Sequence, residues 1–193
     1  MLHLHTVMVP FLVHLMLGFG GRTPVQDAGY DSAAVGRVLE CIREIEKAPI
    51  LSEGAARRAV TLSEAELNAF IAYSFETGGE DVTKELRLKL LDDNFLEGKI
   101  RVDLRGTELP RFLRPDMTFF FSGRLDTRDG EGRLDLKQLF LEKQPIPVTT
   151  LDLVIFAASR INNTEATTLQ DWYPLPYGVL EISISRGKAV FYY

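Results

Sequence analysis

Histidine and cysteine are almost missing from this sequence. Its three histidines all lie within the first 14 of 193 residues, and Cys41 is the single cysteine. One cysteine excludes an intramolecular disulfide, and the body after residue 14 lacks the His and Cys ligands of the common zinc sites. Cys41 lies in an apolar helical pattern without the histidine base that a nucleophile needs, which favours a small core residue. We therefore expect no catalytic residue and no metal ligand in the folded body, and a protein that is not an enzyme.

Motifs for phosphate binding and serine hydrolysis are also missing. The chain has no glycine-rich phosphate loop and no Gly-x-Ser-x-Gly elbow, so we expect no cofactor. The net charge of −5 and the pI near 5.3 argue against a nucleic-acid partner held by phosphate contacts. The pair Asp92-Asp93 is typical of a turn. A hydrolase that uses two carboxylates is a less favoured hypothesis for the function, since the sequence singles out no pair of acids that would face each other across a cleft.

One apolar run is present, at residues 7–20. It is short for a transmembrane helix, which needs about 20 residues, and its length matches the core of a secretory signal peptide. We predict that residues 1–28 are a signal peptide or N-terminal apolar segment and that residues 29–193 form a single α+β domain. The expected location is periplasmic or extracellular, with membrane association as an option. A membrane anchor, a buried N-terminal helix or a mis-assigned start are alternatives, because no Lys or Arg precedes the run.

Three segments show the apolar period of a helix. The first begins near Asp31 or Ser32, either of which can cap it. The second begins with the capping box Ser63-Glu64-Ala65-Glu66 and ends at Gly78-Gly79. The third covers residues 149–161.

Alternating apolar and polar residues predict three β-hairpins. Their turns lie at Asp92-Asp93-Asn94, at residues 127–132 and at Arg186-Gly187. Residues 119–121 and 139–141 are apolar on both faces, so either a strand carries a bulge there or both faces are covered. Tight hairpins imply antiparallel pairing. The expected fold class is α+β, with an antiparallel sheet of about six strands from three hairpins, packed on two to three helices.

Aromatic residues gather in three short segments near residues 120, 173 and 192. Both core packing and the lining of an apolar cavity explain such clusters. The candidate ligand-lining residues are Phe70, Phe119, Phe121, Leu151, Ile155 and Ile182. The candidate partner-contact residues are Trp172, Tyr173 and Tyr177. Arginines of the loop 105–116 are candidates for peripheral contact with anionic lipid headgroups.

Three segments together resemble a known group of proteins: VTLSEAELNAFI at 60–71, TTLDLVIFAASRI at 149–161 and WYPLPYGVLEISISRGKAVFYY at 172–193. Residues 55–193 resemble small bacterial exported proteins of the YpmS and LmeA type, which are similar in shape to tubular lipid-binding (TULIP, BPI-like) domains. The resemblance implies a strongly curved antiparallel sheet around a long helix, with a groove that can hold a lipid acyl chain. It brings no catalytic motif, so it assigns no functional residue.

The expected function is an exported, non-catalytic domain that binds a lipid or another apolar ligand. The alternative is a structural or assembly protein of the cell envelope, which binds a protein partner through an exposed sheet edge or through the 172–177 loop. An open apolar groove between helix and sheet would favour the first, and a space filled by side chains would count against it.

Overall fold

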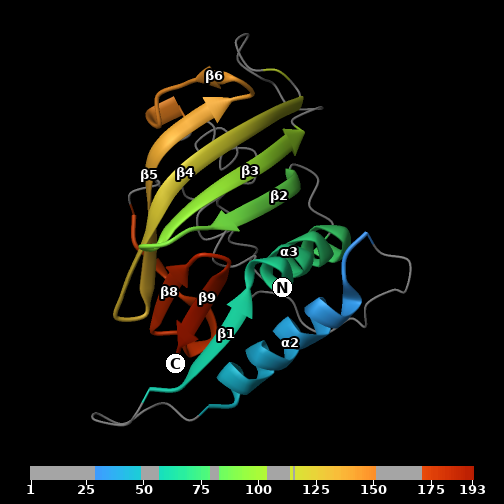
Figure 1. Ribbon diagram of the computed structural model, residues 1–193, viewed down its shortest axis with the longest axis vertical. Helices are drawn as coiled ribbons and strands as arrows, with labels where there is room; N and C mark the ends of the chain where they lie inside the picture. The colour runs from blue at the N-terminus through green and yellow to red at the C-terminus, as the bar shows by residue number, and fades with distance from the viewer. Residues whose placement is uncertain (1–28, 49–56, 79–82, 104–113, 115, 151–170) are drawn as a thin grey trace, which may run out of the picture.

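The computed structural model describes residues 29–48, 57–78, 83–103, 114, 116–150 and 171–193. This part of the chain folds into two antiparallel sheets, two α-helices and one 3-10 turn (Figure 1). The α+β class with a curled antiparallel sheet is therefore confirmed. The predicted signal segment, residues 104–113 of the arginine-containing loop and all but the first two residues of the third helical stripe lie outside the described residues.

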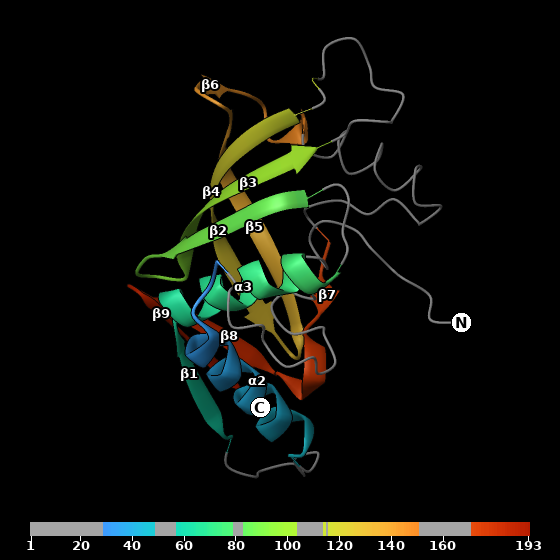
Figure 2. The same cartoon turned by 90° about the vertical axis from the view of Figure 1, so that its right-hand side faces the viewer.

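The larger sheet has six strands in the order β2-β3-β4-β5-β6, with β7 beside β5. Its two long hairpins are the first two predicted ones. Their turns place Asp93, Asn94, Asp129 and Gly130 at positive φ, where Asn, Asp and Gly are the favoured residues. The sheet curls strongly along its length (Figure 2). The strands are β2 Thr83–Leu90, β3 Phe95–Asp103, β4 Asp116–Arg128, β5 Glu131–Leu141, β6 Gln144–Pro145 and β7 Tyr173–Pro174.

The smaller sheet has the order β1-β9-β8, with β1 Ala59–Ser63, β8 Glu181–Ser185 and β9 Lys188–Tyr192. The third predicted hairpin is β8–β9, but it pairs with β1 instead of extending the larger sheet. Sequence analysis had predicted neither β1 nor the division into two sheets. Both depend on pairing between Ala59 and Tyr192, partners far apart in the chain, which local periodicity does not record.

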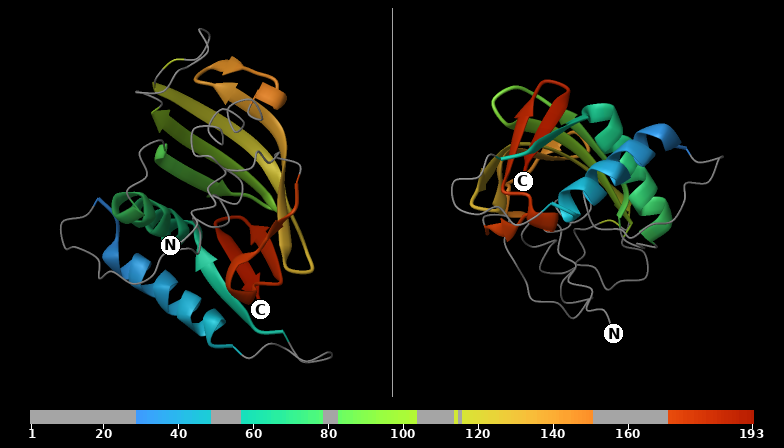
Figure 3. Two further views of the ribbon diagram at one scale, coloured as in Figure 1. Left: turned by 180° about the vertical axis from the view of Figure 1, so that it is seen from behind. Right: turned by 90° about the horizontal axis from the view of Figure 1, so that it is seen from below.

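The two helices begin where their caps predict. Helix α2, Ser32–Glu46, starts after Asp31, whose carboxylate accepts hydrogen bonds from the N–H groups of Ala33 and Ala34. Helix α3, Glu64–Gly78, starts at the predicted capping box. The Ser63 N–H donates to Glu66 Oε2 at 2.7 Å, and the Glu66 N–H donates to Ser63 Oγ at 3.2 Å. The two helices pack side by side (Figure 3).

A β-bulge explains the doubly apolar stretch of the second hairpin. Ser122 pairs with Gln138 while Gly123 pairs with Leu136, so β5 has one extra residue at this point. The extra residue lets side chains on both sides of the bulge, such as Leu134 and Leu139, face the interior, where both are buried. Phe120 faces outward and is 41% exposed. Of the two explanations that the sequence left open, the bulge is confirmed.

Helix α3 lies along the edge of the larger sheet, between that sheet and α2 (Figures 1 and 3). Its packing partners are α2, β1 and the edge strand β2. Within the described residues, no helix is both long and apolar enough to cross a membrane.

Candidate functional site

The predicted ligand-lining residues that the structure describes are all core residues. Phe70 of α3, Phe119 and Phe121 of β4 and Ile182 of β8 are each at most 7% exposed and belong to one apolar cluster. Leu151 and Ile155 lie outside the described residues. Phe119 and Phe121 lie on the inner face of the curled sheet, whereas Phe70 and Ile182 come from α3 and the smaller sheet.

The inner face of the larger sheet is apolar across neighbouring strands. Strand β3 contributes Ile100 and Val102, β4 contributes Met117, Phe119 and Phe121, and β5 contributes Leu139. The ring of Phe121 lies directly over Gly98, because a Cβ atom built on Gly98 would lie 2.1 Å from Phe121 Cζ. The sheet therefore presents a continuous hydrocarbon surface to the interior of the molecule.

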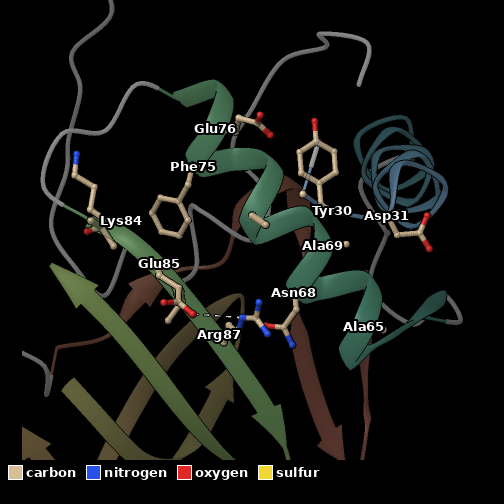
Figure 4. A pocket seen from close by; sticks show the side chains of 14 residues that line it. Tyr30, Asp31, Ala65, Asn68, Ala69, Phe75, Glu76, Lys84, Glu85 and Arg87 are labelled. Carbon is tan, nitrogen blue, oxygen red and sulfur yellow. Dashed lines mark ion pairs between the residues drawn. The ribbon is translucent and has the colours of Figure 1, made fainter. Parts of the chain in front are cut away.

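A separate groove of about 620 Å³ lies outside this core, between α3 and β2 (Figure 4). One wall is the small-residue side of α3, with Ala65, Ala69, Ala72 and Phe75, and the other is the stretch 83–87 of β2. Phe75 and Lys84 lie toward one end, and Asn68 and Arg87 toward the other. Tyr30 and Asp31 line the side nearest α2. None of the predicted ligand-lining residues lines this groove.

Side chains of α3 bond to the backbone of β2 at one end of the groove. Asn68 donates from Nδ2 to the Leu88 carbonyl at 2.7 Å, and its Oδ1 accepts from the Leu88 N–H at 2.8 Å. Glu64 Oε2 accepts from the Leu90 N–H at 2.6 Å. Sequence analysis missed both roles, since nothing in the helical pattern distinguishes Asn68 from an ordinary exposed polar residue.

Charges along β2 are arranged in pairs. Glu85 contacts Arg87 at 3.4 Å on its own strand and Lys99 of β3 at 2.9 Å. These ion pairs are partly exposed, so each contributes little to stability. The strand wall of the groove thus carries charged residues, while the helix wall combines small apolar residues with Asn68 and Glu76.

The predicted partner-contact residues lie at a different place, where β7 pairs with β5. Trp172 is half-buried, with the guanidinium of Arg128 4.0 Å and that of Arg133 4.8 Å from its ring centroid. Tyr173 is buried, so it offers almost no side-chain surface to a partner. The side chain of Tyr177 lies outside the described residues.

The described residues bring together no group of three His, Cys, Asp or Glu side chains that could hold a metal ion. Cys41 is buried in α2, and burial raises the pKa of its thiol. The pKa of the Glu66 carboxyl group is lowered: burial acts to raise this pKa, but the hydrogen bonds from Ser63 and the nearby Arg37 outweigh it. That carboxylate caps a helix.

No protein-family model, no curated protein and no solved structure matches this chain.

Proposed function

We propose that the protein is an exported, non-catalytic binding protein whose ligand is a lipid or another apolar molecule, held against the inner face of the curled sheet. One observation carries the proposal. The inner face of the larger sheet is apolar across β3, β4 and β5. Helix α3 packs against β2, at one edge of this sheet. A ligand with a hydrocarbon chain is the class of molecule that such a surface binds, because burial of apolar area drives the association.

Filling the inner face tests the proposal. Val102→Phe adds volume at a buried position of this surface. If a ligand occupies space there, we expect the variant to keep its fold and to carry at least tenfold less lipid, as measured by native mass spectrometry of the full-length protein after incubation with a total lipid extract. Glu97→Phe is the matched control, because Glu97 lies on the same strand but on the exposed face.

Two results would contradict lipid binding. One is the absence of any lipid adduct on the wild-type protein. The other is a Val102→Phe variant that binds as much lipid as Glu97→Phe does. If the interior is solid, overpacking instead destabilises Val102→Phe by about 1–3 kcal/mol, which urea denaturation would detect.

Export is tested separately. The apolar run at residues 7–20 predicts removal of an N-terminal segment during secretion. We expect N-terminal sequencing of the protein recovered from the exported fraction to begin after the apolar run, between residues 21 and 29. Recovery of the whole chain from the cytoplasm alone would contradict export.

A further inference from the structure

Arg128 breaks the pattern of ion pairs on the larger sheet. The other arginines of β2 to β5 each contact a carboxylate, that of Glu85, Asp116 or Asp126, at N···O distances between 2.7 and 3.7 Å: Arg87, Arg101, Arg124 and Arg133. Arg128 is exposed near the end of β4 and makes no ion pair with any carboxylate of the described residues. A site where a regular local pattern is interrupted is a place to look for function.

The ring of Trp172 takes the place of a carboxylate at Arg128. The guanidinium carbon of Arg128 lies 4.0 Å from the ring centroid, and that of Arg133 lies 4.8 Å from it. Trp172 directly precedes β7, which pairs with β5, so the ring is held beside the two arginines by the sheet. An aromatic ring attracts the face of a guanidinium group. The N–H groups along the edge of the Arg128 guanidinium therefore stay available to a ligand.

Acceptors are scarce around this ring. Arg124 and Arg133 both pair with Asp126, at 3.7 and 3.0 Å, so one carboxylate serves two guanidinium groups. Glu131 lies opposite Arg128 in the register of β4 and β5, but the two form no ion pair in the described part of the chain. Arg133 bonds to Asp126 through Nη2, and its buried Nε–H has no hydrogen-bond partner among the described residues. Such an excess of fixed positive charge favours an anion and repels a cation.

We propose that Arg128 and Arg133 bind an oxyanion, the carboxylate or phosphate group of a ligand, beside the ring of Trp172. The planar guanidinium of Arg128 donates two parallel hydrogen bonds to two oxygens of the anion, and Arg133 adds a second positive charge. Trp172 holds the Arg128 guanidinium in place before the anion arrives, which reduces the entropy lost on binding. Leu125, three residues before Arg128 on β4, faces the interior, so Arg128 faces outward. The site is separate from the inner face of the sheet and does not depend on lipid binding.

The indole N–H of Trp172 allows binding to be followed by NMR, because Trp172 is the single tryptophan of the chain and gives one indole resonance. The probes are inorganic phosphate and acetate, each titrated into the full-length protein at constant pH and constant ionic strength. We expect at least one of the two anions to shift the indole resonance saturably, and sodium chloride alone to leave it unchanged. The anion that binds more tightly identifies the ligand group as a phosphate or as a carboxylate.

Single substitutions separate this site from the general charge of the surface. Arg128→Gln should lower the affinity for the anion about tenfold, the effect of losing one charge-assisted hydrogen bond. Arg128→Lys keeps the charge but not the planar fork, so its affinity should be intermediate. Arg101→Gln is the matched control, because Arg101 is an exposed arginine of the same sheet that is paired with Asp116, and it should bind like the wild type.

Urea denaturation checks that each of these variants is folded. The proposal is overturned if neither anion shifts the indole resonance saturably, if chloride produces the same shift, or if Arg128→Gln binds the anion as tightly as Arg101→Gln does.

Discussion

Asn94 bonds to both the backbone N–H and the backbone carbonyl of Ile184. Its N–H donates to the Ile184 carbonyl at 3.2 Å, and its side-chain Oδ1 accepts from the Ile184 N–H at 2.7 Å. Asn94 lies at the tip of the β2–β3 hairpin, and Ile184 lies in β8 of the smaller sheet. Thr127 does the same for Ile182, with its hydroxyl 3.2 Å from both the nitrogen and the carbonyl oxygen. The two sheets are therefore joined by the backbone N–H of Asn94 and by the side chains of Asn94 and Thr127, which complete the edge of β8.

Substitution of Asn94 should separate its two contributions. Asn94→Gly keeps the positive φ of 61° and removes the side-chain acceptor, so we expect a loss of about 1–3 kcal/mol in the free energy of unfolding. Asn94→Ala should cost about 1–2 kcal/mol more, because alanine is strained at positive φ. Urea denaturation of both variants measures the difference. Equal stabilities would show that backbone conformation contributes nothing at this tip.

Asn68 should protect the protein from aggregation as well as stabilise it. Asn68→Leu leaves the Leu88 N–H and carbonyl without their side-chain partner, and we expect a loss of about 1–3 kcal/mol. The variant also removes the side chain that bonds to the edge of β2 at Leu88, so light scattering at equal concentration should rise. Glu40→Leu, which places the same side chain at an exposed position of α2, is the control. A soluble Asn68→Leu with wild-type stability would contradict the role.

Gly98 should be required by the ring of Phe121. A methyl group at Gly98 would overlap three atoms of that ring, all of them within 2.7 Å. We expect Gly98→Ala to destabilise the protein by about 1–3 kcal/mol through overpacking. Phe121→Leu in the same chain should recover part of the loss, and a double-mutant cycle measures the coupling. Additive effects of the two substitutions would show that the ring moves aside at no cost.

The capping box should make stability depend on pH. The folded-state pKa of Glu66 lies below its ordinary value of 4.5, since the hydrogen bonds from Ser63 outweigh the effect of burial. A lowered carboxyl pKa contributes stability that is present above 4.5 and is lost as the pH falls through the folded-state pKa. We expect Glu66→Gln to lose about 1 kcal/mol at pH 7 and to match the wild type once Glu66 is protonated. Glu76→Gln, at the exposed end of the same helix, is the control, and a Glu66→Gln deficit independent of pH would contradict the assignment.

Trp172 should report on its two arginine neighbours, because it is the single tryptophan of the chain. Arg128→Ala removes the guanidinium 4.0 Å from the ring centroid. We expect a loss of about 0.5–1 kcal/mol and a shift of tryptophan emission to longer wavelength as water reaches the ring. Arg101→Ala on β3 is the control, since its ion pair is with Asp116 and it is not one of the two arginines over the Trp172 ring. Unchanged emission in Arg128→Ala would mean that the contact does not form in solution.

Much of the local structure was predictable. The caps at Asp31 and Ser63, the positive-φ turns at Asn94 and Gly130, and the inward faces of three hairpins follow from interactions within a few residues of the chain. Cys41, which the sequence predicts to be a core residue, is buried for the same kind of reason, because a period of 3.6 residues assigns one face of a helix to the interior. The sequence also left the bulge in β5 as one of two explanations.

The tertiary structure decided how these pieces meet. Pairing of β1 with β9, the division into two sheets and the contacts of Asn68 and Asn94 all join residues that are 20 or more positions apart. The groove also depends on this packing, because one of its walls comes from α3 and the other from β2. An asparagine that completes a strand edge looks the same in sequence as one that faces water. Only the packing of a distant strand against such an asparagine gives its side-chain amide a partner. Composition and periodicity therefore determined the helices and strands and their inward faces, and long-range packing determined the candidate site.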